Sequence, residues 1–222
     1  MLAMRESAAA FGAAYGITVE VTAGPMPAWI EKAKADADVV FSGSETMMTD
    51  FAGAFGGQVD PVAVQPLYLR PAAILVRPGN PGRITGLKDL LQPGPRVLVV
   101  NGAGQNGMWE DVAGRLGDIA SVRAFRTNIA THAANSALAR QAWTEDGSLY
   151  ACLIWSIWQV SNPTLANQVA IEPEYRIYRD TGAVLTHRDT ARADPKEFGA
   201  YLASADDAKI FAKWGWITPA TH

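Results

Sequence analysis

Three segments of the chain share one local pattern, and this pattern limits the folds that the chain can adopt. Each has a short apolar stretch, then a loop of glycine, serine or asparagine, then a helix-forming stretch; they are Val39–Thr46, Val99–Gly107 and Thr131–Ala137. Strands that alternate with helices are typical of an α/β protein with a largely parallel sheet. Ligands of such sheets bind beyond the carboxyl ends of strands, near helix N-termini. The pattern therefore predicts an α/β fold with a ligand site built from strand-end loops.

Other stretches predict further elements of the alternation. Apolar residues on one stripe predict a helix over Leu2–Tyr15, and β-branched residues predict strands over Ile17–Thr22 and Val122–Arg126. The apolar stretch Gln65–Arg77 is long enough for a strand, but Pro71 interrupts it. Because proline removes a ladder hydrogen bond, one uniform central strand is not expected there.

Composition excludes several classes of function. The 222 residues include 19 Lys+Arg and 22 Asp+Glu, a formal net charge of −3, so no general basic field is present to hold a nucleic acid. No apolar run approaches the roughly 20 residues needed to span a bilayer. The single cysteine, Cys152, rules out an internal disulfide framework and a multi-cysteine zinc site. We therefore expect no nucleic-acid partner, no membrane span, no metal and no cofactor.

The strand-end loops carry groups suited to an anion. Free backbone N–H groups and the helix dipole attract negative charge, and the hydroxyls of Ser42, Ser44 and Thr46 add donors. Each feature also has a structural interpretation, because serine and threonine are ordinary N-caps and a glycine-rich loop is an ordinary tight turn. The loop that starts at Gly102 matches the spacing of a dinucleotide fingerprint, but the acidic residue expected at a later strand end is not evident.

Groups for acid–base catalysis are scarce. His132 and Glu45 are the only candidates for a general acid or base, and Cys152 lies in a strand-like apolar run rather than at a helix N-terminus. This scarcity favours binding over catalysis, with an enzyme on the same fold as the alternative. Arg70 has two interpretations, a clamp for an anion or one half of a structural ion pair.

Several long segments carry a family resemblance. The stretches VTAGPMPAWIEKAKADADVVFSGSETMMTDF, PLYLRPAAILVRPGNP, LVVNGAGQNGMWEDVAGRLGD, IWSIWQV and EPEYRIYRDTG together resemble the accessory colonization factor AcfC family. That family is similar to the molybdate- and sulfate-type (type II) periplasmic solute-binding proteins of ABC transporters. The resemblance implies two α/β lobes, residues 1–70 with 180–222 and residues 71–179, each with a mostly parallel sheet flanked by helices. It also implies an anionic ligand in an interlobe cleft, either an oxyanion or a phosphorylated or carboxylated metabolite, and an ABC permease as partner.

The resemblance also places the expected ligand contacts. The first strand-end loop would bind the anion from lobe one, and loops of lobe two would face it. Apart from the resemblance, Arg176 lies in a short polar-aromatic stretch with Tyr175 and has two interpretations, a charge partner of the anion or one half of an ion pair with a nearby acidic residue. The expected ligand-binding residues are Ser42, Gly43, Ser44, Glu45, Thr46, Asn101, Gly102, Ala103, Gly104, Gln105, Asn135, Ser136, Trp155, Ser156, Tyr175 and Arg176.

The N-terminus departs from this family. Relatives begin with a signal peptide, a first strand and a Gly/Pro-rich loop, whereas this chain opens directly in a helix pattern without a basic start or a cleavage site. On its own this indicates a cytoplasmic protein, whereas the resemblance implies the periplasm. Either the true start lies upstream or lobe one lacks its first strand. Two alternatives stay open at this point, an adhesin or surface antigen, and a homodimer formed through exposed aromatic residues.

Overall fold

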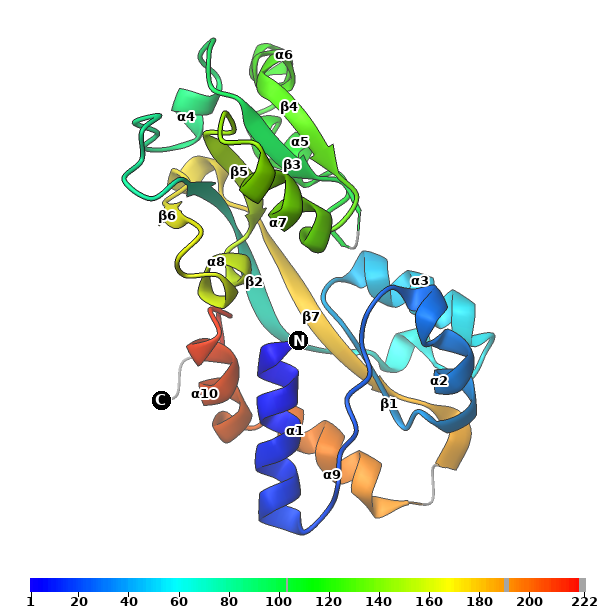
Figure 1. Cartoon of the computed structure of the whole chain (residues 1–222). Coiled ribbons are helices and arrows are strands. Elements are labelled where there is room, and N and C mark those ends of the chain that lie inside the picture. The colour runs from blue at the N-terminus through cyan, green and yellow to red at the C-terminus, as the bar shows by residue number, and fades with distance from the viewer. Residues whose placement is uncertain (103, 190–191, 220–222) are drawn as a thin grey trace. The chain divides into compact units, whose positions relative to one another are not determined.

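The computed structural model describes residues 1–102, 104–189 and 192–219, which leaves the expected site residue Ala103 outside the described residues. The chain divides into two compact units, unit 1 with Met1–Leu69 and Arg179–His222, and unit 2 with Arg70–Tyr178. It passes between them within strand β2, Gln65–Val76, and within strand β7, Tyr178–Leu185 (Figure 1). Unit 2 is thus one continuous stretch of chain, whereas unit 1 is built from two stretches.

The remaining elements divide between the units as follows. Unit 1 contains helices α1 (Leu2–Tyr15), α2 (Ile30–Asp36), α3 (Glu45–Phe55), α9 (Ala193–Leu202) and α10 (Ala205–Lys213) and strand β1 (Val39–Ser42). Unit 2 contains helices α4 (Leu87–Leu90), α5 (Met108–Ala113), α6 (Ile119–Asn128), α7 (Ser136–Glu145) and α8 (Ile157–Ser161) and strands β3 (Val97–Val100), β4 (Ile129–Ala133), β5 (Ala151–Trp155) and β6 (Asn167–Val169). Within the described residues, no helix has the length and apolar character that a bilayer crossing requires.

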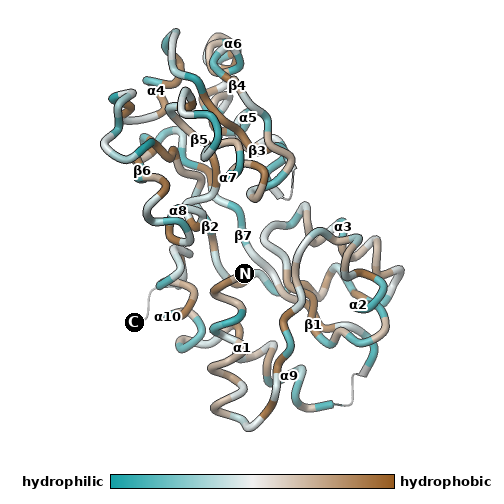
Figure 2. The backbone as a smooth tube through the Cα atoms, viewed as in Figure 1, coloured by the Kyte–Doolittle hydropathy of each residue, from teal (hydrophilic) through white to brown (hydrophobic). Residues whose placement is uncertain are grey.

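Unit 2 is a sheet covered by helices on both faces. Strand β3 runs parallel to β4 and β5, so that Val99 lies beside His132 on one side and Leu153 on the other. Strand β2 runs antiparallel to β5, with Ala72 opposite Trp155. Alternate residues of each strand enter two apolar clusters, one under α4, α5 and α6 and the other under α7. Hydrophobic residues accordingly run along the strands of this unit in Figure 2.

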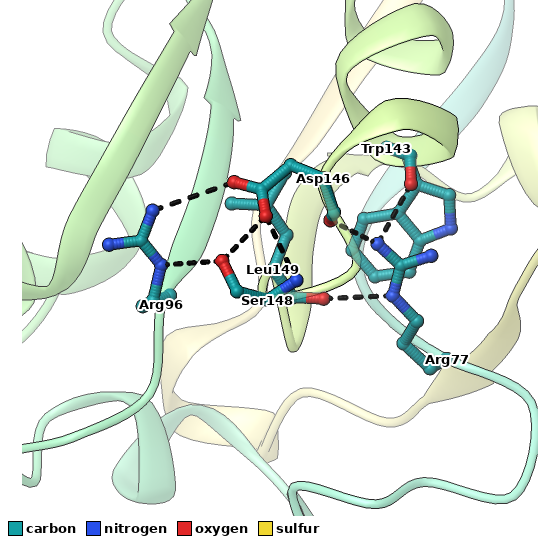
Figure 3. Close-up of polar contacts among 6 residues, drawn as sticks. All are labelled: Arg77, Arg96, Trp143, Asp146, Ser148 and Leu149. Carbon is teal, nitrogen blue, oxygen red and sulfur yellow. Dashed lines mark hydrogen bonds and ion pairs between the residues drawn. The ribbon is translucent and has the colours of Figure 1, made fainter.

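Helix α7 is fixed at its C-terminal end by Arg77, which follows β2 directly (Figure 3). The Arg77 guanidinium donates to the carbonyl oxygens of Trp143 at 2.8 Å, Asp146 at 2.6 Å and Leu149 at 3.0 Å. It also lies 4.2 Å from the centroid of the Trp143 ring. The last carbonyls of a helix have no partner within the helix. One arginine therefore satisfies these carbonyls and fixes the helix whose other end borders the strand-end loops.

Unit 1 contains a short antiparallel strand pair between two helical layers. Strand β1 pairs with β7, Val40 opposite Val184. Apolar side chains of α3, among them Phe51 and Phe55, pack with these two valines in one cluster. Aromatic residues join the remaining helices to the core; Phe41 of β1, for example, lies 6.0 Å from Phe211 of α10, measured between ring centroids.

The mixed α/β class is confirmed, but the expected mostly parallel sheets are not. In unit 1 the β1–β7 pair is antiparallel, and in unit 2 parallel and antiparallel pairs are mixed. The antiparallel pairs arise because β2 and β7 carry the chain out of one unit and back into the other, so they run against the strands that they join.

Three predicted elements were wrong. Ile17–Thr22 is no strand, although its residues are β-branched, because no neighbouring strand pairs with it. Val122–Arg126 lies inside α6, which begins where the Asp118 side chain accepts hydrogen bonds from the backbone N–H groups of Ala120 and Ser121. Strand β2 continues through Pro71, whose carbonyl oxygen still accepts a hydrogen bond from the Ser156 N–H at 3.0 Å.

Candidate functional site

The carboxyl ends of β3, β4 and β5 meet at one edge of the unit 2 sheet, because parallel strands end on the same side. The loops that follow β3 and β4 touch there. The Asn101 N–H donates to the Ala133 carbonyl at 2.8 Å. At Gly102 the two backbones are so close that a Cβ atom would lie 2.2 Å from the Ala134 carbonyl oxygen. Glycine at this position is therefore a packing requirement that brings two of the predicted loops together.

Gln105 connects these two loops through its side chain. It is 2% exposed, and its Nε2 donates to the Ser136 hydroxyl at 3.1 Å. Its Oε1 is buried without a hydrogen-bond partner in the described structure. Exchanging the amide oxygen and nitrogen would leave the nitrogen unpartnered instead, so one polar atom of Gln105 remains for a ligand in either orientation.

Asn135 has the ordinary capping role that the sequence left open for it. Its Oδ1 accepts from the backbone N–H groups of Ala137 at 3.0 Å and Leu138 at 2.9 Å, so it caps the ten-residue helix α7. Ser136 is the first residue of that helix. The cap positions its hydroxyl next to Gln105, where it borders the same sheet edge.

Trp155 and Ser156 lie where β5 ends, beside the β3 loop. Their exposed fractions are 2% and 5%, and Trp155 Nε1 and Ser156 Oγ are buried without a hydrogen-bond partner in the described part of the chain. The guanidinium of Arg70, in β2, lies 4.5 Å from the Trp155 ring centroid, and Arg70 is 6% exposed. Sequence reasoning left Arg70 undecided; the signal that could have singled it out is a charged residue inside an otherwise apolar strand. Buried polar atoms without partners are uncommon, so their gathering at one edge indicates a binding site.

In the strand-end loop of unit 1, the hydroxyls of Ser42 and Ser44 form hydrogen bonds to the backbone of the loop and of the helix that follows. The buried Ser42 hydroxyl donates to the Ser44 carbonyl at 3.0 Å, and the Thr181 hydroxyl donates to the Ser42 carbonyl. Ser44 is the N-cap of α3, because its Oγ accepts from the Met47 N–H at 3.2 Å. Gly43 is half-buried between the two serines. The loop is thus a fixed turn that presents the start of an eleven-residue helix.

Glu45 and Thr46 form the exposed first turn of α3. The pKa of the Glu45 carboxyl is raised, first by partial burial and then by the nearby Asp180 carboxylate. Glu45 is therefore more readily protonated than an ordinary glutamate. An anion at this helix start would be repelled less by a protonated Glu45 than by a charged one.

The described contacts of Tyr175 and Arg176 lie away from the polar atoms of these loops, although Tyr175 shares an apolar cluster with Trp155. Tyr175 is buried in the apolar cluster under α4, α5 and α6. The Arg176 Nε donates to the carbonyl of Ile171 at 2.9 Å, within its own segment. Among the described residues, no hydrogen bond joins either of them to the three strand-end loops of unit 2.

Groups that could hold a metal ion do not gather in the described structure. Residues 1–102, 104–189 and 192–219 contain no cluster of three or more His, Cys, Asp or Glu side chains that could hold a metal. His132 is exposed on β4. Burial raises the pKa of the Cys152 thiol far above its usual range, which keeps it from acting as a thiolate nucleophile.

Replacing Gly102 with alanine tests the contact between the two loops. The new Cβ would meet a backbone oxygen, which cannot move aside cheaply, so we expect a loss of about 1–3 kcal/mol in the free energy of unfolding. Urea unfolding followed by tryptophan fluorescence measures it. Gly147→Ala is the matched control, because its Cβ would meet nothing within 4 Å. Equal stability of the two variants would contradict the close approach.

Comparisons with known proteins assign this chain to a family. Residues 1–217 match the family model described as bacterial extracellular solute-binding protein. The crystal structure of L-phospholactate-bound PEB3 superimposes with a TM-score of 0.90 at 36% identity, covering 97% of this chain and 94% of that one. Another PEB3 structure, from Campylobacter jejuni, gives a TM-score of 0.88 at the same identity and coverage. A comparison with curated proteins found no match.

More distant structures share the fold alone. The sulfate-binding protein SubI from Mycobacterium tuberculosis H37Rv gives a TM-score of 0.76 at 16% identity, covering 98% of this chain and 83% of that one. The ferric binding protein from Campylobacter jejuni gives 0.67 at 13% identity, covering 98% and 83%. One of these names a bound anion and the other a cation, so the fold by itself does not decide the ligand. The family match and the PEB3 likeness over nearly the whole chain show that this chain belongs to the bacterial extracellular solute-binding proteins.

Proposed function

We propose that this chain binds a small organic anion that carries a phosphate, a carboxylate or both. The observation that carries the proposal is the set of buried polar atoms without partners at one edge of unit 2, from Gln105, Trp155 and Ser156. An anion removed from water needs several hydrogen-bond donors, since burying it unpaired is very costly. PEB3, which is 36% identical, has been crystallised with L-phospholactate, a ligand of this chemistry.

Unit 1 has a second feature suited to an anion, the start of α3. Its fixed Ser42–Ser44 turn presents backbone N–H groups at the positive end of an eleven-residue helix. Unit 2 would contribute Ser136 at the start of α7 and the loop that contains Gln105.

The cellular role follows from the family. Solute-binding proteins of this kind act outside the cytoplasmic membrane, so we propose that this chain is periplasmic. It would deliver its ligand to an ABC permease without changing the ligand chemically. We also propose that the chain belongs to the AcfC-like branch. An inorganic oxyanion such as molybdate or sulfate is the alternative ligand. A homodimer stays a prediction.

A panel of ligands tests the proposed function. Thermal unfolding of the purified chain is measured with L-phospholactate, 3-phosphoglycerate, L-lactate, inorganic phosphate, sulfate and molybdate, with a neutral sugar as control. At 100 times its dissociation constant a ligand adds about 2.7 kcal/mol of stability. We expect a phosphorylated carboxylate to give the largest shift and to be recovered intact. The proposal would be refuted if the neutral sugar gave the largest shift, or if none of the anions gave a shift.

Ser44→Ala tests the contribution of unit 1. Because both the cap and a hydroxyl close to the ligand are lost, we expect affinity for the best anion to fall at least about tenfold, as for a hydrogen bond to a charged group. Isothermal titration calorimetry measures it. Ser204→Ala is the matched control: Ser204 caps α10 by the same bond, its Oγ accepting from the Asp207 N–H at 3.2 Å. Both variants should lose similar stability, and only Ser44→Ala should lose affinity; unchanged affinity would remove this loop from the site.

A further inference from the structure

Arg70 and Arg77 of unit 2 both lie over tryptophan rings, and their surroundings differ in chemistry. Arg77 lies over Trp143, where its neighbours are acceptors, the three carbonyl oxygens that it satisfies (Figure 3). Arg70 lies over Trp155, whose indole Nε1–H is buried without a hydrogen-bond partner, as is the hydroxyl of the next residue, Ser156. An indole N–H only donates, and a hydroxyl can donate. Arg77 is thus placed as a structural cap, whereas Arg70 stands beside further donors.

Strand register brings these groups together. Trp155 pairs with Ala72, and side chains two apart on a strand share a face, so Arg70 and Trp155 lie on the same face of the sheet. Ser156 follows Trp155 directly at the end of β5, and its N–H donates to the Pro71 carbonyl at 3.0 Å. All three side chains, from Arg70, Trp155 and Ser156, are more than nine-tenths buried. The surrounding core therefore fixes the positions of these side chains.

The chemistry of this cluster selects an oxyanion group. A guanidinium has five N–H donors in a planar fork, which is more than a single acceptor group can use. Two of these donors together match two oxygens of a phosphate or a carboxylate. The tryptophan ring holds the fork in one plane and lowers the cost of burying its charge. Cationic groups would be repelled by Arg70, whereas a phosphate or a carboxylate would be attracted to it.

We infer that Arg70, stacked on Trp155, binds an oxyanion group of the ligand, phosphate or carboxylate, together with Ser156 Oγ and Trp155 Nε1. This inference rests on the proposed function and assigns the charge partner of the site to Arg70. Sequence reasoning had assigned that role to Arg176, whose guanidinium donates to the Ile171 carbonyl. Arg70 makes no covalent step; it binds and orients.

Calorimetric titration of the full chain with L-phospholactate, L-lactate and inorganic phosphate tests the inference. In Arg70→Met, we expect affinity for the best of these anions to fall about 100-fold, the usual size of the loss when one partner of a buried charge pair is truncated. In Arg70→Lys the charge remains and the fork is lost, so a loss of about tenfold is expected. If loss is seen with phosphate and L-phospholactate but not with L-lactate, the group is phosphate. Loss with L-lactate and L-phospholactate but not with phosphate assigns the carboxylate.

Two further variants separate ligand contact from folding. Trp155→Phe keeps an aromatic ring under the guanidinium and removes only the indole N–H, so affinity should fall about tenfold while the circular dichroism spectrum is unchanged. Arg126→Met is the matched control, because Arg126 also lies over a tryptophan, 5.8 Å from the Trp109 centroid, on the exposed face of α6. Its affinity should stay within about twofold of the wild type.

The outcomes are distinct. If folded Arg70→Met binds within about threefold of the wild type, the inference is overturned while the proposed function stands. If Arg70→Met does not fold, unchanged affinity in both Arg70→Lys and Trp155→Phe overturns it equally. If the wild type binds none of the anions, the proposed function fails, and the inference fails with it.

Discussion

Replacing Arg77 with methionine should lower the free energy of unfolding by roughly 3 kcal/mol, as expected when a charged donor to several partly buried carbonyls is lost. The three carbonyl oxygens that Arg77 satisfies belong to the end of α7 and the turn after it, and methionine offers them no donor. The loss of the contact with the Trp143 ring adds to the effect. Urea unfolding followed by tryptophan fluorescence reports on it directly, since Trp143 is itself a fluorophore.

Arg96→Met is the control for Arg77. Arg96 lies in the same cluster, donates to the Ser148 hydroxyl at 3.0 Å and approaches Asp146 at 3.5 Å, but its side chain is 52% exposed (Figure 3). Exposed ion pairs contribute little, so we expect a loss of less than about 1 kcal/mol. Arg77→Lys should recover little of the lost stability, because a single ammonium cannot reach three carbonyls in different directions. Equal stability of the Arg77 and Arg96 variants would contradict the capping role.

Replacing Asp207 with asparagine should make the protein more stable at neutral pH. Asp207 is fully buried in unit 1, and burial raises its pKa to about 6 from 3.8, with opposing contributions from hydrogen bonds to Ser7 and Tyr68. The Tyr68 hydroxyl lies 2.6 Å from the Leu202 carbonyl and 3.1 Å from Asp207 Oδ2. Its single proton cannot serve both acceptors fully, so a neutral Asp207 that donates in return suits the cluster better than a carboxylate.

The pH dependence of stability has a definite sign. Because the pKa of Asp207 is higher in the folded chain than in the unfolded chain, its contribution to stability is fully present below about pH 4 and is lost as the pH rises through about 6. The size of the loss is on the order of 3 kcal/mol, since one pKa unit corresponds to about 1.4 kcal/mol. Asp207→Asn stays neutral, so it should match the wild type near pH 4 and exceed it above pH 7. Urea unfolding at several pH values measures this. Lower stability than the wild type at every pH would refute the explanation.

Sequence reasoning was most successful where the local pattern was strong. Gly16 ends the first helix in the left-handed conformation, with a φ of 70°, and the Ser44 cap begins the third, which are both local signals. It failed where partners decided the outcome. Ile17–Thr22 has strand residues without a neighbouring strand, and the β-branched Val122 lies in a helix that Asp118 caps. The antiparallel pairs of β2 and β7 depend on where the chain leaves and re-enters each unit, which no local pattern records.

The candidate site shows the same division between local and distant information. The strand-end loops of unit 2 were predicted, and the register of β3 with β4 and β5 brings them to one edge. The contact between Gln105 and Ser136, and the stacking of Arg70 on Trp155, join residues that lie far apart in the sequence. Only the pairing of the strands, a product of the whole core, makes them neighbours. For the same reason the sequence did not single out Arg70, which we propose as the charge partner of the ligand.

The division of the chain between the units has a consequence for the order of folding. Unit 2 lies within Arg70–Tyr178, so its whole sequence has left the ribosome before synthesis ends. Unit 1 needs β7, α9 and α10 from the last part of the chain to complete its core. During synthesis from the N-terminus, Met1–Leu69 must therefore wait, with apolar residues such as Phe11 and Phe41 lacking their later partners Phe198 and Phe211. The newly made chain would thus be most vulnerable to aggregation and proteolysis in its first third, although that third is made first.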